Sequence, residues 1–348
     1  MDSINLVLSN RCQAACVWCP STRGTKQKYD MPFELVERIV EEVTSESFPF
    51  EIKSVRLSEN GEAILNHDFF KIARYIREKL PNSRIDLMSN FLSLDKDKSA
   101  IIVKERLVDA LTVNIDGHDK ESYEAVKRVD YETVIQNLKD FNSLHVHHGS
   151  TIEVLVNAMP YYEYDQAVRW VLRTKPLNYV DHRSDKISKK IDRSTRAEDI
   201  IKRHYSDEVP YSNFDLVLKS LHFLHNNPYM RFKKSRPGLW AERQSIADGT
   251  AKPVMQKNEL SCPELLRVMN EAFISPAGDW YPCCLDDNQD ISLGNVYDNT
   301  ILEIYNSEKR QTFIQMLIDK KFDEIGYPCN TVEACQTIVF NDVKDYCE

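Results

Sequence analysis

Short stretches of alternating or continuous hydrophobic residues recur along the first half of the chain, and stretches with hydrophobic residues three or four positions apart lie between them. The first pattern is typical of β-strands and the second of amphipathic α-helices. They predict strands at residues 4–8, 54–58, 84–88, 110–115 and 151–156, and helices at residues 30–43, 67–80, 99–107, 131–144 and 162–173. In the first helix, Asp30 is the expected cap and Pro32 lies in the first turn. Strands that alternate with helices in this way indicate repeated βα units and a parallel sheet.

The regular alternation ends after Arg173. Residues 176–260 contain a basic run and one amphipathic helix, through Phe214 to Leu224, and we interpret them as an insertion that completes or covers the barrel. Solvated helices are the alternative interpretation. Further on, residues 273–281 predict a β-hairpin and residues 300–317 a helix. We therefore divide the chain into a core (1–175), a basic helical insertion (176–260) and a small C-terminal domain (261–348).

Composition narrows the class of protein. The 348 residues are 42% hydrophobic, which is enough for a large core, and no apolar run is long enough to cross a membrane. The formal net charge of −9 argues against general binding of nucleic acid. Residues 1–9 do not read as a secretory signal, so we expect a cytoplasmic protein without a membrane partner. In a reducing compartment, nine cysteines indicate metal ligation rather than disulfides.

Three of these cysteines, Cys12, Cys16 and Cys19, lie within eight positions. Three thiolates suit a 4Fe-4S cluster in which one iron keeps no protein ligand. Structural zinc or buried thiols are the alternatives, but zinc needs a fourth ligand and the next cysteine is Cys262. The spacing C-x3-C-x2-C, with Trp18 before the last cysteine, resembles the radical S-adenosylmethionine (SAM) superfamily. The resemblance implies that SAM binds the open iron and is cleaved to a 5'-deoxyadenosyl radical, which removes a hydrogen atom from the substrate.

Polar residues follow several of the predicted strands, at the edge where ligands collect on parallel sheets. Asn60-Gly61-Glu62 resembles the Gly-Gly-Glu element that binds the SAM amino group in this superfamily, with asparagine at the first glycine position. We expect Gly61 to let the backbone approach the ligand and Glu62 to suit an ammonium. Asn114 and Asp116 lie in a stretch that resembles the Ser-Ile-Asp-Gly element near the SAM ribose. Asn90 and Asn157 end two further strands. From this position alone, each is interpreted either as a SAM contact or as a loop cap.

The C-terminal cysteines resemble the SPASM or Twitch cluster domain. The resemblance rests on Gly278-Asp-Trp-Tyr-Pro-Cys283, on Leu293 to Val296, and on the surrounding cysteines, and it implies an auxiliary 4Fe-4S cluster. A full SPASM domain has seven cysteines, and only six lie here, so we expect one auxiliary cluster. Zinc is the alternative. The predicted ligands are Cys262, Cys283, Cys329 and Cys335, with Cys347 as a replacement ligand or a free thiol.

The resemblance implies a fold of a partial (β/α)6 TIM-like barrel with a parallel sheet and a small C-terminal cluster domain. It also implies an enzyme that draws electrons from a donor such as flavodoxin or ferredoxin. The chain begins at the first strand, so we expect a small polar substrate such as a sugar or amino sugar, oxidised with the help of the auxiliary cluster. A peptide-modifying maturase, an epimerase, and a non-catalytic iron–sulfur or zinc carrier are the alternatives. Asp286 is a candidate base or an acidic turn, and Cys284 a candidate hydrogen-atom donor or a packed thiol.

Overall fold

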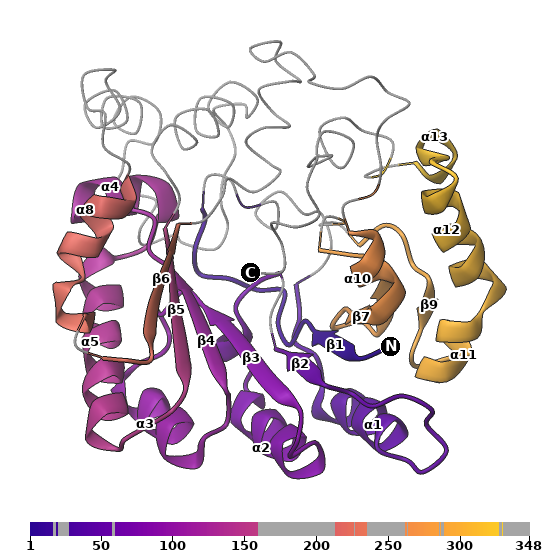
Figure 1. The fold of residues 1–348 in the computed structure, drawn as a ribbon, viewed down its shortest axis with the longest axis horizontal. Coiled ribbons are helices and arrows are strands. Elements are labelled where there is room, and N and C mark those ends of the chain that lie inside the picture. Colours follow the sequence, from indigo (N-terminus) through magenta and orange to yellow (C-terminus); the bar gives the residue numbers. More distant parts are fainter. Residues whose placement is uncertain are drawn as a thin grey trace.

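The computed structural model describes residues 1–16, 19, 28–57, 60–158, 213–225, 227–234, 262, 264–284, 286, 289–326 and 329. Within these residues lies a nine-stranded sheet with the strand order β6-β5-β4-β3-β2-β1-β7-β8-β9 (Figure 1). The strands are β1 (Ser3–Leu6), β2 (Ser54–Arg56), β3 (Arg84–Ser89), β4 (Ala110–Asn114), β5 (Glu153–Ala158), β6 (Met230–Lys234), β7 (Glu271–Ile274), β8 (Asp279–Tyr281) and β9 (Gly294–Asn295). Neighbours from β6 through β7 are parallel, and the last two pairings are antiparallel.

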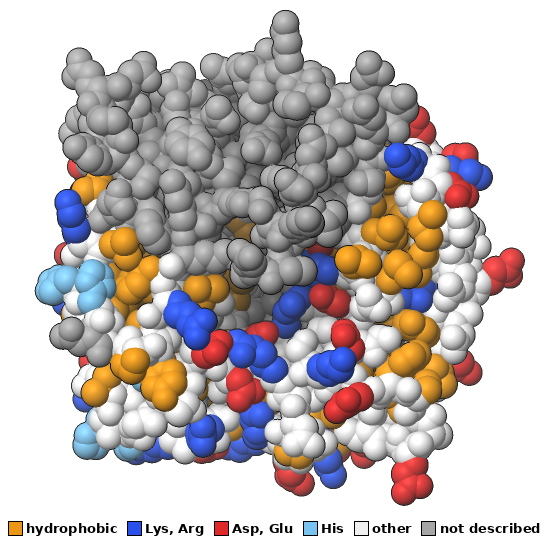
Figure 2. Space-filling view, in the orientation of Figure 1, with side chains coloured by type: hydrophobic (Ala, Val, Ile, Leu, Met, Phe, Trp, Pro, Cys, Tyr) orange, Lys and Arg blue, Asp and Glu red, His pale blue; other side chains and the backbone are white. Residues whose placement is uncertain are grey.

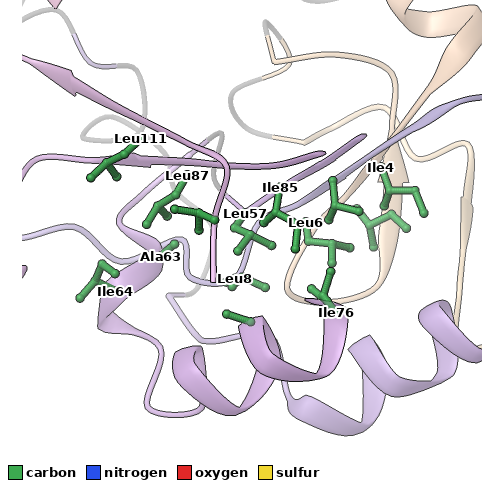
Figure 3. Packing of buried hydrophobic residues seen from close by; sticks show 14 of the residues in the cluster. Ile4, Leu6, Leu8, Leu57, Ala63, Ile64, Ile76, Ile85, Leu87 and Leu111 are labelled. Carbon is green, nitrogen blue, oxygen red and sulfur yellow. The ribbon is translucent and has the colours of Figure 1, made fainter. Parts of the chain in front are cut away.

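Helices follow the strands along the chain and cover one face of the sheet (Figure 1). They are α1 (Phe33–Val43), α2 (Phe69–Lys79), α3 (Lys96–Glu105), α4 (Lys120–Lys127), α5 (Tyr131–His147), α8 (Asn213–Ser220), α10 (Leu265–Asn270), α11 (Ile301–Asn306), α12 (Glu308–Ile318) and α13 (Phe322–Ile325). Alternate strand residues such as Leu6, Ile85 and Leu111 are buried in one continuous core, together with Ile76 of α2 (Figure 3). A strand presents alternate residues to opposite faces, so the residues between these buried ones line the inside of the curved sheet.

The predicted strands and helices of the first half are confirmed wherever the structure describes them, with ends that differ by up to three residues. The helix predicted at residues 162–173 lies outside the described residues. Helix α4 was not predicted, although Asp119 and Ser122 form a capping box at its start. Asp30 does not cap α1, because the helix begins later, at Phe33, and the Asp30 carboxylate binds Arg11 instead. The helix predicted at residues 300–317 breaks at Ser307, which caps α12.

The segment interpreted as an insertion contributes a strand that the sequence analysis missed. β6 pairs in parallel with β5 over five residues, from Met230 to Lys234. Six parallel strands, β1 to β6, therefore form the partial barrel. The described residues include no helix that is both long and apolar enough to cross a bilayer.

The C-terminal hairpin is joined directly to the barrel. β7 lies beside β1 in parallel register, from Ser3 opposite Glu271 to Leu6 opposite Ile274. The predicted hairpin of β7 and β8 is confirmed. A second link comes from α1, where the Glu42 carboxylate accepts hydrogen bonds from the backbone N–H groups of Ile301 (2.8 Å) and Leu302 (2.9 Å). A carboxylate at a helix N-terminus satisfies donors that have no partner within the helix. The C-terminal domain is thus anchored on the barrel at two places.

Candidate functional site

The cysteine loop (residues 12–19) begins shortly after β1, at the carboxyl edge of the sheet. The amide of Asn66 donates to the carbonyls of Leu8 (2.7 Å) and Met31 (2.9 Å), which ties the two ends of the surrounding segment together. Within the loop, the N–H of Cys19 donates to the carbonyl of Cys16 at 3.0 Å. This hydrogen bond fixes the position of Cys19 relative to Cys16, and no three His, Cys, Asp or Glu side chains of the described residues lie close enough together to hold a single metal ion.

The three thiols act electrostatically on one another. Burial raises the pKa of the Cys16 thiol to about 11 and that of Cys12 still higher, and the neighbouring cysteines add to both effects. None of the seven described cysteines forms a disulfide. Three thiolates so close together need a positive partner, and a four-iron cluster supplies one because each thiolate binds a different iron. The donor set therefore fits the predicted cluster.

Glu62 lies beside this loop with only 1% of its surface exposed. Its carboxylate accepts hydrogen bonds from the N–H of Asn90 (2.8 Å) and, more weakly, of Ile64 (3.5 Å). Burial nevertheless raises the pKa of Glu62 to about 7, because the carboxylate loses its hydration. A bound ammonium group would restore the lost stabilisation. The site thus suits the amino group of SAM, as the sequence predicts.

Gly61 allows a close approach within the protein itself, and its expected approach to a ligand stays a prediction. A Cβ at this position would lie 2.2 Å from the carbonyl oxygen of Ser9 and 2.9 Å from that of Arg11, and the glycine φ of +100° is in the left-handed region. The N–H of Glu62 donates to the Arg11 carbonyl at 2.7 Å. The close approach is therefore between two segments of the protein, and it presses Glu62 against the cysteine loop.

Four predicted asparagines lie along the same edge. Asn90 donates to Cys12 Sγ and to Gln13 at 3.5 Å each, and Asn114 donates to Met88 Sδ at 3.9 Å. The buried Nδ2 of Asn60 and Oδ1 of Asn157 have no hydrogen-bond partner among the described residues. A buried polar atom without a partner costs free energy, so a polar ligand that reached these two atoms would be stabilised by them. Their role in SAM binding stays a prediction.

Asp116 is buried in an ion pair. Its carboxylate lies 3.1 Å from Nζ of Lys127, and both side chains are almost fully buried, at 3% and 6% exposed. Lys127 was not predicted as a site residue, because it lies in the helix α4 that the sequence analysis missed. The observed partner of Asp116 is Lys127. The ribose contact predicted for Asp116 stays a prediction.

The C-terminal cysteines are described in part. Cys262, Cys283 and Cys329 are buried, whereas the predicted ligands Cys335 and Cys347 lie outside the described residues. Cys284 is half-buried, and Arg267 donates to its Sγ at 3.5 Å. The candidate base Asp286 is fully buried, and its carboxylate accepts hydrogen bonds from the N–H groups of residues 290 (2.9 Å) and 291 (3.0 Å). These contacts hold the Asp286 carboxylate within its own loop, and its role as a base stays a prediction.

A cavity of about 660 Å³ lies against the inner face of the barrel, and we call it the lumen. Its lining comes from β2 to β7 and α10: Arg56, Arg84, Asp86, Leu87, Met88, Ala110, Thr112, Glu153, Val154, Leu155, Arg231, Arg267 and Glu271. The charged groups are paired, with Arg56 on Glu271 at 3.0 Å and Arg84 on Glu153 at 2.8 Å. Figure 2 shows basic and acidic side chains next to each other on the face that Figure 1 views. These pairs were missed, because only the folded sheet brings alternate residues of distant strands together.

The comparisons with protein families agree with this geometry. The model of the radical SAM superfamily matches residues 6–171, and that of the SPASM iron–sulfur cluster-binding domain matches residues 262–336. The chain therefore contains a radical SAM domain followed by a SPASM domain. A radical SAM enzyme with a SPASM domain uses a 4Fe-4S cluster, SAM and auxiliary iron–sulfur chemistry, so the predicted cofactors are confirmed. No curated protein matches the sequence significantly.

Solved structures show the same fold at low sequence identity. BtrN in complex with AdoMet and 2-DOIA has a TM-score of 0.51 and 15% identity, covering 99% of this chain and 95% of that one. SuiB of Streptococcus suis bound to S-adenosylmethionine has a TM-score of 0.52 and 16% identity, covering 90% and 68%. Native anSMEcpe with bound AdoMet has a TM-score of 0.50 and 16% identity, covering 96% and 89%. The predicted fold class is thereby confirmed.

Proposed function

We propose that this radical SAM enzyme oxidises a small polar metabolite, such as a sugar or amino sugar, by removal of a hydrogen atom. When bound, the cluster and SAM supply the 5'-deoxyadenosyl radical that removes the hydrogen, and the auxiliary cluster accepts the second electron. The observation that carries the proposal is the lumen, whose volume of about 660 Å³ suits a small molecule and whose lining extends along β3 as far as Met88, toward the carboxyl edge that bears the cysteine loop.

The lining of the lumen also favours a polar ligand. Thr112 offers a hydroxyl near the middle of β4, whereas the charged pairs around Glu271 and Glu153 border the lumen at the amino edge, where they hold neighbouring strands together. Met88 and Leu155 supply apolar wall. Such a mixture of fixed polar groups with some apolar surface suits a hydroxyl- or amino-substituted ring. The BtrN structure, which contains 2-DOIA, has the same fold, and its small ligand is in line with this substrate class.

The test is anaerobic reconstitution with reductant and SAM, followed by addition of amino sugars and polyols that carry deuterium on carbon. We expect deuterium to appear in 5'-deoxyadenosine only with an accepted substrate, together with a product two hydrogens lighter. The Cys16→Ala variant is the control for cluster-dependent chemistry. Turnover of peptides alone, with no deuterium transfer from any small substrate, would contradict the proposal.

Epimerisation is the second candidate, and Cys284 favours it. This half-buried thiol contacts Arg267, which also lines the lumen. An epimerase needs a group that returns a hydrogen atom to the substrate radical, and a thiol is chemically suited to that. Reaction in D2O separates the two functions: an epimerase incorporates solvent deuterium into carbon and loses product formation in Cys284→Ala, whereas an oxidase keeps most turnover in that variant.

A further inference from the structure

A row of four side chains crosses the inner face of the sheet from β3 to β6. Met88 is in register with Thr112, Thr112 with Leu155, and Leu155 with Arg231. All four line the lumen. Residues in register on neighbouring strands lie side by side on the same face of a sheet. The row is therefore a continuous strip of the lumen wall, and it ends at the guanidinium of Arg231.

The row lies one layer nearer the carboxyl edge than the paired charges. In the layer below it, Arg56 is in register with Asp86, Asp86 with Ala110, and Ala110 with Glu153. On β3, β4 and β5 the members of the row come two residues later, which is roughly 7 Å further along each strand. Arg231 thus lies on the side of the paired charges that is nearer the cysteine loop.

Arg231 differs from the other arginines of the lumen in how its charge is met. Arg56, Arg84 and Arg267 each lie 3.1 Å or less from a carboxylate oxygen. Arg231 has one ion pair with a described residue, to Glu153 at 4.0 Å, and no hydrogen bond with any residue in the described ranges. The Glu153 carboxylate is already bound by Arg84 at 2.8 Å. The N–H donors of Arg231 are therefore unused within the part of the chain that the structure describes.

A guanidinium with unused donors is suited to an oxyanion. Its planar N–H groups match two oxygens of a carboxylate or phosphate, and these charge-assisted hydrogen bonds are stronger than neutral ones. The Arg231 side chain is 71% exposed, so solvent screens its longer-range attraction and a direct contact is needed. The chain has a formal net charge of −9 and does not attract anions in general. An anion in the lumen would therefore be recognised by this side chain.

We propose that Arg231 selects substrates that carry a carboxylate or phosphate group and binds that group at the β6 end of the row. The inference rests on the proposed function and narrows its substrate class from small polar metabolites to acidic ones. Arg231 and Thr112 are two strands apart, which separates their backbones by roughly 10 Å. Leu155 lies on the strand between them and supplies apolar surface for the carbon face of the ligand.

The test compares three sugars that differ in one group: glucose, glucuronate, and glucose phosphorylated on its primary hydroxyl. Equilibrium binding to the anaerobically reconstituted protein is measured with SAM but without reductant, so that no turnover occurs, and at one ionic strength. In wild type, we expect at least one acid to bind at least roughly tenfold tighter than glucose. The two acids distinguish carboxylate from phosphate. Arg231→Gln should abolish the advantage and leave glucose binding unchanged, and Arg231→Lys, which keeps the charge but not the planar fork, should retain part of it.

Arg74→Gln is the matched control. It also removes one partly exposed guanidinium, but from α2, where Arg74 pairs with Glu105 and does not line the lumen. The acids should keep their full advantage in this variant. Three results would overturn the proposal: acids that bind wild type no tighter than glucose or not at all, an advantage that survives in Arg231→Gln, or one that is lost equally in Arg74→Gln.

The same proteins distinguish this inference from the proposed function. If an acid binds through Arg231 but no small substrate transfers deuterium to 5'-deoxyadenosine, the oxidation proposal fails and the anion site stands. If neutral sugars are oxidised and an acidic group gives no advantage in binding, the oxidation proposal stands and the role of Arg231 is overturned.

Discussion

The two edges of the barrel are made of the same strands but satisfy their polar groups differently. At the amino edge, Arg56 and Arg84 pair with Glu271 and Glu153 across neighbouring parts of the sheet. At the carboxyl edge, Glu62 is buried beside the cysteine loop with a raised pKa. Buried atoms of two asparagines there, Asn60 and Asn157, have no partner among the described residues.

This difference separates groups that serve the fold from groups that await a ligand. Paired charges stabilise the folded chain as it stands, whereas an unpaired buried group costs free energy until something binds to it. Substitutions at the amino edge should therefore lower stability, and substitutions at the carboxyl edge should lower ligand binding. The predictions below test that division.

The largest effect is expected at the cysteine loop. Changing Cys12, Cys16 and Cys19 together to Ala should remove about half of the roughly eight irons that two four-iron clusters would hold, and abolish 5'-deoxyadenosine formation. Iron analysis of the anaerobic protein measures this. Cys284→Ala is the matched control and should keep all of its iron. About four irons in the intact protein would contradict an auxiliary cluster.

Glu62→Gln should weaken SAM binding at least roughly tenfold while leaving the iron content unchanged. The substitution removes the charge that an ammonium would meet but no iron ligand, and a hydrogen bond to a charged group contributes roughly 1.5–3 kcal/mol. Equilibrium binding of SAM to the reconstituted variant measures the loss. Equal affinity in wild type and variant would show that this carboxylate does not contact SAM.

Glu271→Gln is the counterpart at the amino edge. Its Oε2 accepts hydrogen bonds from Asn5 (3.0 Å), Arg56 (3.0 Å) and Arg267 (3.1 Å). Neutralising it should lower the free energy of unfolding by roughly 1–3 kcal/mol, because Arg56 and Arg267 each lose one charged contact. Denaturant titration measures the change, and SAM affinity should stay at the wild-type value. If Glu271→Gln lost as much SAM affinity as Glu62→Gln, the two edges would not differ in function as stated above.

His145 should give the smallest effect, as a pH dependence of stability at the amino edge. One ring nitrogen lies 2.9 Å from the Ile152 carbonyl and the other 3.1 Å from the Asn227 amide, and burial lowers the pKa of the ring. The unfolded chain therefore binds a proton at this histidine more readily than the folded chain does. The contribution of neutral His145 to stability is present above about pH 6.5 and is lost as the pH falls below that value. Denaturant titrations at pH 7.5 and 5.5 measure the free energy of unfolding. Between these two pH values it should fall more in wild type than in His145→Gln. An equal fall in the two proteins would contradict the role given to His145.

Local pattern was enough to predict the strands and helices of the barrel, because their buried residues repeat at regular spacing. It was not enough for α4, whose start at Asp119 follows the site residues Asp116 and Gly117 so closely that the whole stretch reads as a loop. It also missed β6, where Arg231, Lys233 and Lys234 suggest a solvated segment although the backbone completes the barrel. In both places the sheet, and not the local sequence, decides the structure.

The candidate site divides in the same way. Short spacing identified the cysteine loop and Glu62, because the residue types needed for the chemistry lie close together in the sequence. The pairing of Lys127 with Asp116, and of Arg56 with Glu271, depends on tertiary contacts that no local pattern encodes. The sequence explained the glycine at position 61 only by approach to a ligand. The contacts that require it also involve Ser9 and Arg11, which are about fifty residues away in the sequence.

The parallel pairing of β1 with β7 means that the cysteine loop and the C-terminal hairpin are carried by adjacent strands of one sheet. The pairing spans four residue pairs, from Ser3 opposite Glu271 to Leu6 opposite Ile274. All four would have to separate before the C-terminal hairpin could move as a rigid body away from the cysteine loop. The distance between the cluster-bearing ends of these strands is therefore set by strand spacing. No hinge lies within this pairing, so the cysteine loop and the hairpin that leads to Cys283 are held at a fixed separation.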